Sequence, residues 1–177
     1  MKYIVFPVCD RSLESLRAGD RVEISGTIYV ARDAAHQRFI EALKKKRRLP
    51  VDLKDGLIYY MGPTPTPPGK VIGSCGPTTS SRMDALTVPL LARGLKGMMG
   101  KGRRSDEVIA GCRKYGAVYF ITYGGCGAYL NGFVKEAEVA AYADLGPEAV
   151  YRLRVERFPA VVGIDTSGRD FYQTRRK

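Results

Sequence analysis

Residues 21–30 (RVEISGTIYV) carry the clearest period-two pattern in the chain and constrain its fold more than any other segment. Apolar side chains occupy alternate positions here: Val22, Ile24, Ile28 and Val30. The positions between them are mainly charged or hydroxyl-bearing, which predicts a strand with one buried face. Gly26 falls on the apolar face, where we expect a bulge or the close approach of another backbone.

Three segments have helical patterns instead: 33–46, 83–92 and 105–116. Asp33 is placed to cap the first of them, and Pro50 lies beyond its end. The third begins at Ser105 and stops at Gly116, which is the favoured combination of a hydroxyl N-cap and a C-terminal glycine.

Short apolar runs predict further strands: the first seven residues, 57–61, a short strand around 71–72, 98–103 leading into a glycine-rich turn, 117–122, 137–142, 151–156 and 160–165. The run 117–122 is continuously apolar and predicts burial on both faces. The proline-rich segment 62–69 predicts a stiff surface loop. Six or seven strands and three helices predict one α/β domain over residues 1–177. No apolar run reaches the ~18–20 residues needed to span a bilayer.

The chain has 29 Lys and Arg against 18 Asp and Glu, a formal net charge of +11. Such an excess predicts an anionic partner, which could be a nucleic acid, an acidic protein surface or a small anion. The run KKKRR (44–48) is interpreted as a solvated helix end, and a second basic group, RRK, closes the sequence.

Four cysteines are spread widely, at Cys9, Cys75, Cys112 and Cys126, and His36 is the one histidine of the sequence. Zinc and iron–sulfur sites need closely spaced ligands, so a metal site built by this chain alone is not expected. The first residues are typical of a strand and not of an export signal, so we expect reduced thiols and a cytoplasmic location.

Polar residues gather in three short segments that follow predicted strands: ARDAAHQR (31–38), GSCGPTTSSRMD (73–84) and GKG (100–102). Arginine donors, hydroxyls and an accessible lysine would suit a small dianion. Each segment also has a simpler interpretation: a surface ion pair of Arg32 with Asp33, an N-capping loop before the 83–92 helix, and an ordinary turn lysine. Aromatic residues are not interleaved as in a platform for single-stranded nucleic acid.

These segments, with the closing LGPEAVYRLRVERFPAVVGIDTSGRDFY, resemble in the same order the β subunit, or C-terminal domain, of the class I (iron–sulfur) fumarate hydratases. The L-tartrate dehydratase β subunits share that family. The resemblance extends from about residue 16 to the end and implies a single swivelling β/β/α domain. It also implies a partner α subunit whose three cysteines hold a [4Fe–4S] cluster, within a hetero-oligomer such as α2β2. None of the four cysteines here matches a cluster ligand of the family.

Carried over by position, the family's substrate-binding arginines fall on Arg32 and Arg82, and its glycine-flanked lysine falls on Lys101. The threonine proposed as the catalytic base falls on Thr78, with Thr79 beside it as a substrate contact. His36 matches the histidine of the first motif and is predicted to be catalytic. This sequence departs from the family at Ser81, where relatives commonly have glycine, and at GGCGAYL (124–130).

The resemblance implies a hydro-lyase subunit that helps to interconvert fumarate and (S)-malate and is inactive without its α subunit. Fixed cations would stabilise the negative charge that develops on a substrate carboxylate. Three alternatives stay open: a β subunit of L-tartrate dehydratase or mesaconate hydratase, a non-catalytic structural subunit, and a basic nucleic-acid-binding module.

Overall fold

The computed structural model describes residues 1–9 and 11–174, and the terminal RRK group lies outside them. Its sheet has the order β1-β2-β3-β4-β5-β7-β6. The strands are β1 (Lys2–Phe6), β2 (Arg21–Val30), β3 (Leu57–Tyr59), β4 (Gly97–Gly100), β5 (Val118–Ile121), β6 (Val134–Ala141) and β7 (Val150–Ile164). Because β2 also pairs with β7, the strands β2, β3, β4, β5 and β7 form a closed circuit.

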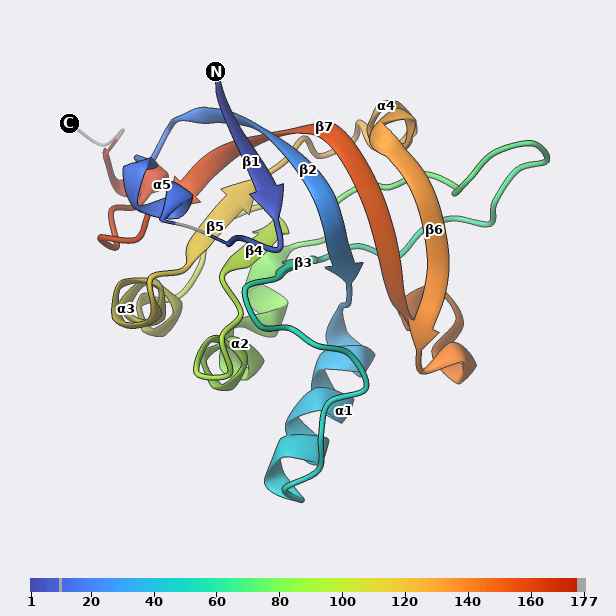
Figure 1. Cartoon of the computed structure of the whole chain (residues 1–177), viewed down its shortest axis with the longest axis horizontal. Coiled ribbons are helices and arrows are strands. Elements are labelled where there is room, and N and C mark those ends of the chain that lie inside the picture. Colours follow the sequence, from blue (N-terminus) through green and yellow to red (C-terminus); the bar gives the residue numbers. More distant parts are fainter. Residues whose placement is uncertain (10, 175–177) are drawn as a thin grey trace.

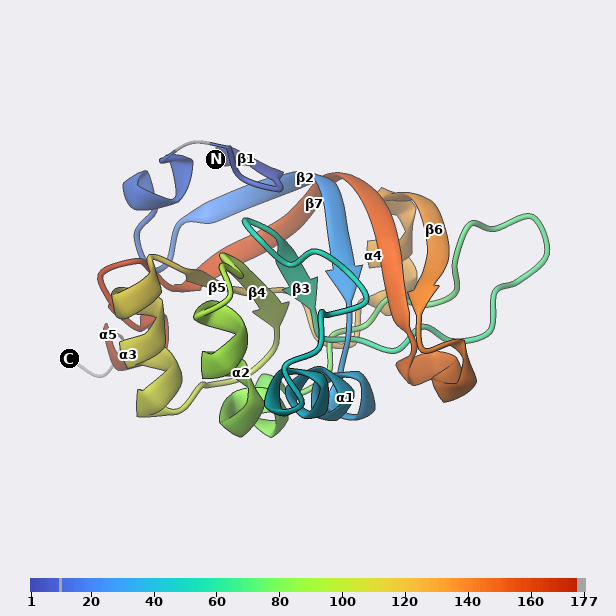
Figure 2. The ribbon, with the colours of Figure 1, turned by 60° about the horizontal axis from the view of Figure 1, so that its bottom comes forward.

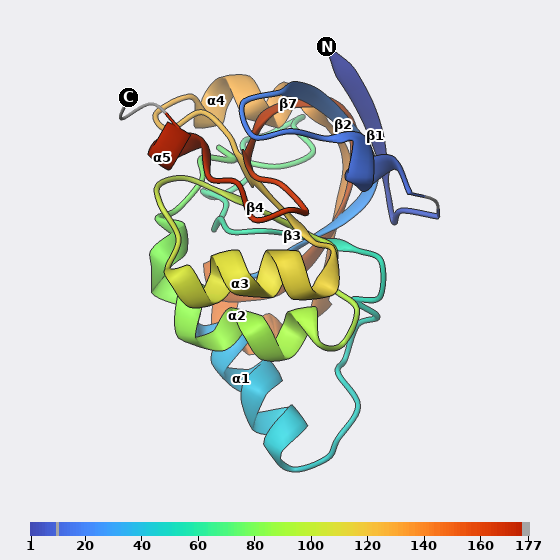
Figure 3. The same ribbon diagram turned by 90° about the vertical axis from the view of Figure 1, so that its left-hand side faces the viewer.

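The structure is a mixed α/β arrangement in layers (Figure 1). The parallel strands β2 to β5 are followed in the chain by helices, whereas β7 runs antiparallel to β2, β5 and β6. Figure 2 shows β2, β7 and β6 arching over β3–β5, with the helices that follow β2, β3 and β4 on the other side. The helices are α1 (Asp33–Lys44), α2 (Asp84–Leu91), α3 (Asp106–Tyr115), α4 (Gly127–Leu130) and α5 (Phe171–Thr174). Figure 3 shows α1, α2 and α3 together on one side of the sheet.

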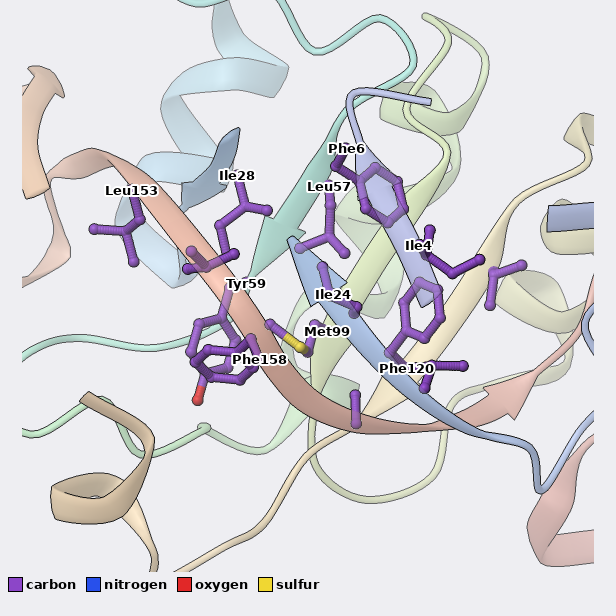
Figure 4. Close-up of a cluster of buried hydrophobic side chains, with 14 of the residues drawn as sticks. Ile4, Phe6, Ile24, Ile28, Leu57, Tyr59, Met99, Phe120, Leu153 and Phe158 are labelled. Carbon is purple, nitrogen blue, oxygen red and sulfur yellow. The ribbon is translucent and has the colours of Figure 1, made fainter. Parts of the chain in front are cut away.

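The central strands are buried on both faces, as the apolar run 117–122 predicts. Leu57, Tyr59, Met99 and Phe120 face the arch, where Tyr59 packs edge to face on Phe158 at 5.4 Å between ring centroids (Figure 4). Residues at the intervening positions face the helices: Ile58, Tyr60, Met98 and Tyr119. Burial of two apolar layers is the main stabilising term of such a fold.

The predicted strand 21–30 is confirmed, and its four alternating apolar residues are all buried in the layer under the arch. Gly26 has a φ of +101°, and a Cβ atom there would overlap the Phe6 carbonyl oxygen. The β2–β7 register also shifts between Ile24 and Gly26. Both expectations for this glycine are therefore correct.

Two strand predictions are wrong. Residues 71–72 form bends and not a strand, although Ile72 is buried under the arch. The segments 151–156 and 160–165 are one strand, β7, which continues through a left-handed residue, Arg157 (φ 53°). The bulge opposite Gly26 absorbs that residue, so the strand bends there and does not end.

The helix predictions are correct in type and close in extent. Helix α1 ends at Lys44, and α2 begins at Asp84 after a 3₁₀ turn over Ser80–Met83. Helix α3 begins after Ser105 and ends at Tyr115, and the next residue, Gly116, has the left-handed φ of 61° expected of a glycine C-cap. Arg32, and not Asp33, occupies the N-cap position of α1. No helix in the described part of the chain is long and apolar enough to cross a bilayer.

Candidate functional site

The predicted site residues follow the carboxyl ends of neighbouring parallel strands. Arg32 comes two residues after β2, and Lys101 comes directly after β4. Strand β3 lies between these two strands and pairs in parallel with both. Because parallel strands end at the same edge of a sheet, the fold brings segments far apart in sequence to one place, which is where α/β sheets bind ligands.

Asp33 joins the two predicted substrate arginines. Its Oδ2 accepts a hydrogen bond from Arg32 Nε at 3.1 Å, and its Oδ1 accepts one from Arg82 Nε at 2.8 Å. Glu148 Oε1, from the segment between β6 and β7, also lies 3.1 Å from Arg32 Nε. The ion pair of Arg32 with Asp33 is therefore real, and it orients the arginines while balancing part of their charge.

Asp33 is held in its charged form. Partial burial alone would raise its pKa, but its own backbone N–H and the Arg32 and Arg82 guanidinium groups outweigh that effect and lower the pKa. Arg82 is half exposed, whereas the side chains of Arg32 and Asp33 are about one-quarter exposed. The cluster thus holds two arginines and two carboxylates at a partly open surface, and its arginine donors are directed by the carboxylates.

The hydroxyl-rich loop and the glycine-flanked lysine lie side by side. Thr79 and Lys101 form an isolated parallel bridge, in which the Ser80 N–H donates to the Lys101 carbonyl at 2.9 Å. The Thr78 N–H in turn donates to the Tyr60 carbonyl at 2.8 Å. The side chains of Thr79 and Lys101 are exposed, and Thr78 is half buried. This backbone pairing brings the exposed residues Thr79 and Lys101 together, and Thr78 directly precedes Thr79 in the loop.

His36 lies behind this surface and is fully buried. Its Nδ1 is 3.0 Å from the Arg32 carbonyl oxygen, which can only accept, so Nδ1 carries the proton. The ring packs on Tyr60 at 5.3 Å between centroids. Burial lowers the pKa of His36 to about 4, so the ring is neutral near pH 7. Its catalytic role stays a prediction; the geometry makes it a support for the Arg32 backbone.

Comparison with known proteins identifies the family. The family model described as Fumarase C-terminus matches residues 4–175. The chain therefore belongs to the fumarase C-terminus family.

Several members with known names are similar over most of this chain. The aerobic class I fumarate hydratase of Escherichia coli K12 is 43% identical over 155 residues, covering 86% of this chain and 28% of that protein. Mitochondrial fumarate hydratase 1 of Leishmania major is 42% identical over 155 residues, and this match also covers 86% of this chain and 28% of that protein. The L(+)-tartrate dehydratase subunit beta of E. coli K12 is 33% identical over 181 residues, covering 99% of this chain and 89% of that subunit. The chain thus spans little more than a quarter of the fumarate hydratases but nearly all of a tartrate dehydratase β subunit.

The thiols of this family member do not suit an iron–sulfur cluster. Cys75 and Cys112 are buried, and burial raises the pKa of each to about 12, so neither supplies a thiolate. Cys9 and Cys126 are exposed. Among the described residues there is no group of three or more His, Cys, Asp or Glu side chains placed to hold a metal ion. The donors in the described part of the chain therefore do not fit a cluster.

Sequence reasoning missed a buried cation beneath the site. The side chain of Arg104 is fully buried, and its Nε donates to Asp84 Oδ1 at 2.6 Å. Arg104 follows Arg103 in a polar stretch that has the pattern of a solvated turn. The signal that the sequence offers for Arg104 is its position three residues after Lys101, a predicted site residue.

Proposed function

We propose that this chain is the β subunit of a hydro-lyase that hydrates fumarate to (S)-malate and catalyses the reverse reaction. The observation that carries the proposal is the meeting of Arg32 and Arg82 on one carboxylate, Asp33, at the strand edge that also presents the Thr78–Thr79 loop and Lys101. Membership of the fumarase C-terminus family supports the reaction class.

The donor groups of this surface suit a dicarboxylate. Asp33 holds both arginines and Glu148 pairs with Arg32, while Lys101 supplies a third cation at the same strand edge. Guanidinium groups recognise carboxylates through paired donors. Cations fixed before the reaction stabilise the charge that builds on a carboxylate when the adjacent carbon gains or loses a proton. In this proposal Arg32 and Arg82 orient the substrate, and Lys101 stabilises that charge.

Thr78 is proposed as the group that moves the proton, with Thr79 contacting the substrate. An ordinary hydroxyl is a weak base, so Thr78 needs a nearby cation or a proton acceptor from another chain. Lys101 is the cation that the backbone pairing places beside this loop. The family motif assigns His36 to the same chemistry, and its burial favours a supporting role.

The active site is proposed to be completed by an α subunit in a hetero-oligomer such as α2β2, in the cytoplasm. A [4Fe–4S] cluster held by that subunit would supply a Lewis acid for the hydroxyl group. The similarity to a protein named as the β subunit of L(+)-tartrate dehydratase supports a partner chain.

An L-tartrate dehydratase is the second candidate, and the 33% identity to an L(+)-tartrate dehydratase subunit beta favours it. The higher identity to fumarate hydratases favours fumarate. Mesaconate, a methylated fumarate, is a third substrate to test. A purely structural subunit and a basic nucleic-acid-binding module are the alternatives outside enzyme chemistry.

The test is to produce the chain with its α partner, assemble the cluster without oxygen, and assay fumarate, malate, L-tartrate and mesaconate. We expect fumarate and malate to have the highest kcat/KM and either chain alone to be inactive. Preference for L-tartrate would select the second candidate, and full activity of this chain alone would overturn the shared site. Nucleic-acid binding with a steep salt dependence and no response to dicarboxylates would instead indicate the basic module.

Two variants test the assignments in the same complex. Thr78→Ala should lower kcat by about 10²-fold or more, as loss of a positioned proton-transfer group does. An unchanged kcat would remove Thr78 as the base. Arg32→Ala should raise KM for the dicarboxylate, whereas a purely structural subunit would leave KM unchanged.

A further inference from the structure

Arg104 lies between two aromatic rings beneath the site. Its guanidinium carbon is 5.2 Å from the ring centre of Tyr60 and 5.0 Å from that of Tyr119. The side chain is fully buried and donates from Nε to Asp84 and from a terminal nitrogen to Thr87 Oγ1 at 2.9 Å. Burial opposes its charge, but Tyr60 and Asp84 outweigh that effect and its pKa is raised. The cation is therefore a permanent part of the packing.

Each of the two tyrosines is attached to one of the site loops. The Tyr60 carbonyl accepts the Thr78 N–H at 2.8 Å. Tyr119 Oη lies 2.9 Å from Ser80 Oγ and 2.9 Å from the Gly102 carbonyl oxygen. A carbonyl only accepts, so both contacts are satisfied when Tyr119 donates to Gly102 and Ser80 donates to Tyr119. The Tyr119 hydroxyl therefore joins the residue after Thr79 to the residue after the site lysine.

The remaining contacts leave little room for the loops to shift. Asp84 Oδ2 accepts the Ser105 N–H at 2.6 Å, so one carboxylate joins the start of α2 to the start of α3. At Gly100, a Cβ atom would overlap Ser80 Oγ. Arg104 thus contacts α2, which directly follows the turn that carries Arg82, and the two tyrosines that hydrogen-bond to Thr78 and Ser80.

We propose that Arg104 and the Tyr119 hydroxyl are positioning residues that set the spacing between the Thr78–Thr79 loop and Lys101. This inference rests on the proposed hydro-lyase function for its consequence in catalysis. Neither side chain would touch the substrate, because Arg104 is fully buried and Tyr119 is 1% exposed. Their effect would be on the geometry of the groups above them, where a shift of about 1 Å can lower a rate about 10²-fold.

The experiment compares Tyr119→Phe with Thr122→Val in the reconstituted complex. Thr122 is a matched control, since it is also buried and its hydroxyl also donates to a carbonyl, that of Pro159, at 2.9 Å. We expect Tyr119→Phe to lower kcat by about 10-fold or more, with KM within about threefold, because Arg32 and Arg82 are anchored separately through Asp33. Thr122→Val should retain kcat within about twofold at a similar loss of Tm.

A second variant and a second readout complete the design. Arg104→Lys keeps the charge but loses the planar group between the rings, and it should lower kcat at least as much as Tyr119→Phe. In this chain alone, Tyr119→Phe should speed hydrogen exchange at the amides of Ser80 and Lys101 about 10-fold relative to Thr122→Val.

The outcomes separate this inference from the proposed function. A parent complex inactive on every dicarboxylate, with exchange still faster in Tyr119→Phe, would refute the hydro-lyase and leave the spacing role in place. Unchanged exchange at Ser80 and Lys101 would overturn the spacing role. A kcat loss in Tyr119→Phe no larger than in Thr122→Val would overturn it as well.

Discussion

The two ends of helix α1 carry positive charge in different ways. At its start, Arg32 and Arg82 are both hydrogen-bonded to Asp33, and Glu148 lies close to Arg32. At its end, the side chains of the run 44–48 are exposed, and Lys45 forms an ion pair with Glu41 of the helix. This run also borders an open hollow of about 660 Å³. The first region holds its cations in fixed directions, and the second leaves them in solvent.

This difference shows why net charge says little about function here. Exposed cations are screened by salt and contribute little to stability or specificity. Cations held by carboxylates keep their donors aimed at one place, which selective binding of an anion needs. The run 44–48 accounts for much of the basic excess, yet the arginines at the start of α1 and at the 80–83 turn carry the functional interpretation.

The largest difference in stability should come from Arg104, whose side chain is fully buried. Arg104→Met removes its charge and leaves Asp84 without its buried partner, so the free energy of unfolding should fall by roughly 3–5 kcal/mol. Arg48→Met, in the exposed run, should change it by less than about 0.5 kcal/mol. Urea unfolding of both variants measures the difference, and equal losses would abolish the distinction between the two kinds of cation.

The pH dependence of stability should reveal the buried histidine behind Arg32. Burial lowers the folded-state pKa of His36 to about 4, from the ordinary 6.5, so the unfolded chain binds the proton first. Stability from this group is complete above pH 6.5 and should fall by roughly 2–3 kcal/mol between pH 6.5 and 4.5. The lowered pKa of Asp33 acts only at more acidic pH. Urea unfolding measured across this pH range should show the fall in stability in the parent and not in His36→Gln.

Arginine substitutions in the reconstituted complex compare the two ends of α1 directly. Arg82→Ala should lower kcat/KM for fumarate about 10²-fold, since it removes a charged donor from the proposed transition state. Arg47→Ala, at the far end, should stay within about twofold of the parent because it lies in the solvated run. Comparable losses in both would mean that overall charge, and not placement, attracts the substrate.

The smallest effect should come from Asp33→Asn, which keeps the shape of the bridge and removes its charge. Arg32 and Arg82 would lose their anchor but gain net positive charge. We therefore expect kcat to fall about 10-fold while KM does not rise. A rise in KM with unchanged kcat would mean that Asp33 serves binding alone and does not orient the arginines.

Much of the fold follows from local pattern. Strand β2 and the C-terminal glycine of α3 were predictable because side-chain period and left-handed backbone are properties of neighbouring residues. Ile72 was misassigned because an apolar pair buries equally well in a bend. The sequence predicts two strands in place of β7, with a break that includes Arg157 and Pro159. The bulge that continues the strand through this break lies opposite Gly26, which is far away in the sequence.

The site divides in the same way. The family motifs named Arg32, Thr78, Thr79, Arg82 and Lys101, and the sheet brings their segments to one edge. The bridge from Asp33 to Arg82 and the enclosure of Arg104 depend on contacts between separate elements. No spacing within a motif reports such contacts. The swivelling motion and the single-domain organisation that the resemblance implies remain predictions.

The closed circuit of strands has a consequence for the order of folding. Strand β2 pairs with β7 from Arg21 against Val161 to Val30 against Tyr151, so strands from opposite halves of the chain must meet before the circuit closes. Pairings so distant in sequence slow folding because loop closure costs entropy before the contacts form. During synthesis the edge of β2 that pairs with β7 would stay unpaired until β7 has been made. We expect this interval to be when the chain is most prone to aggregate.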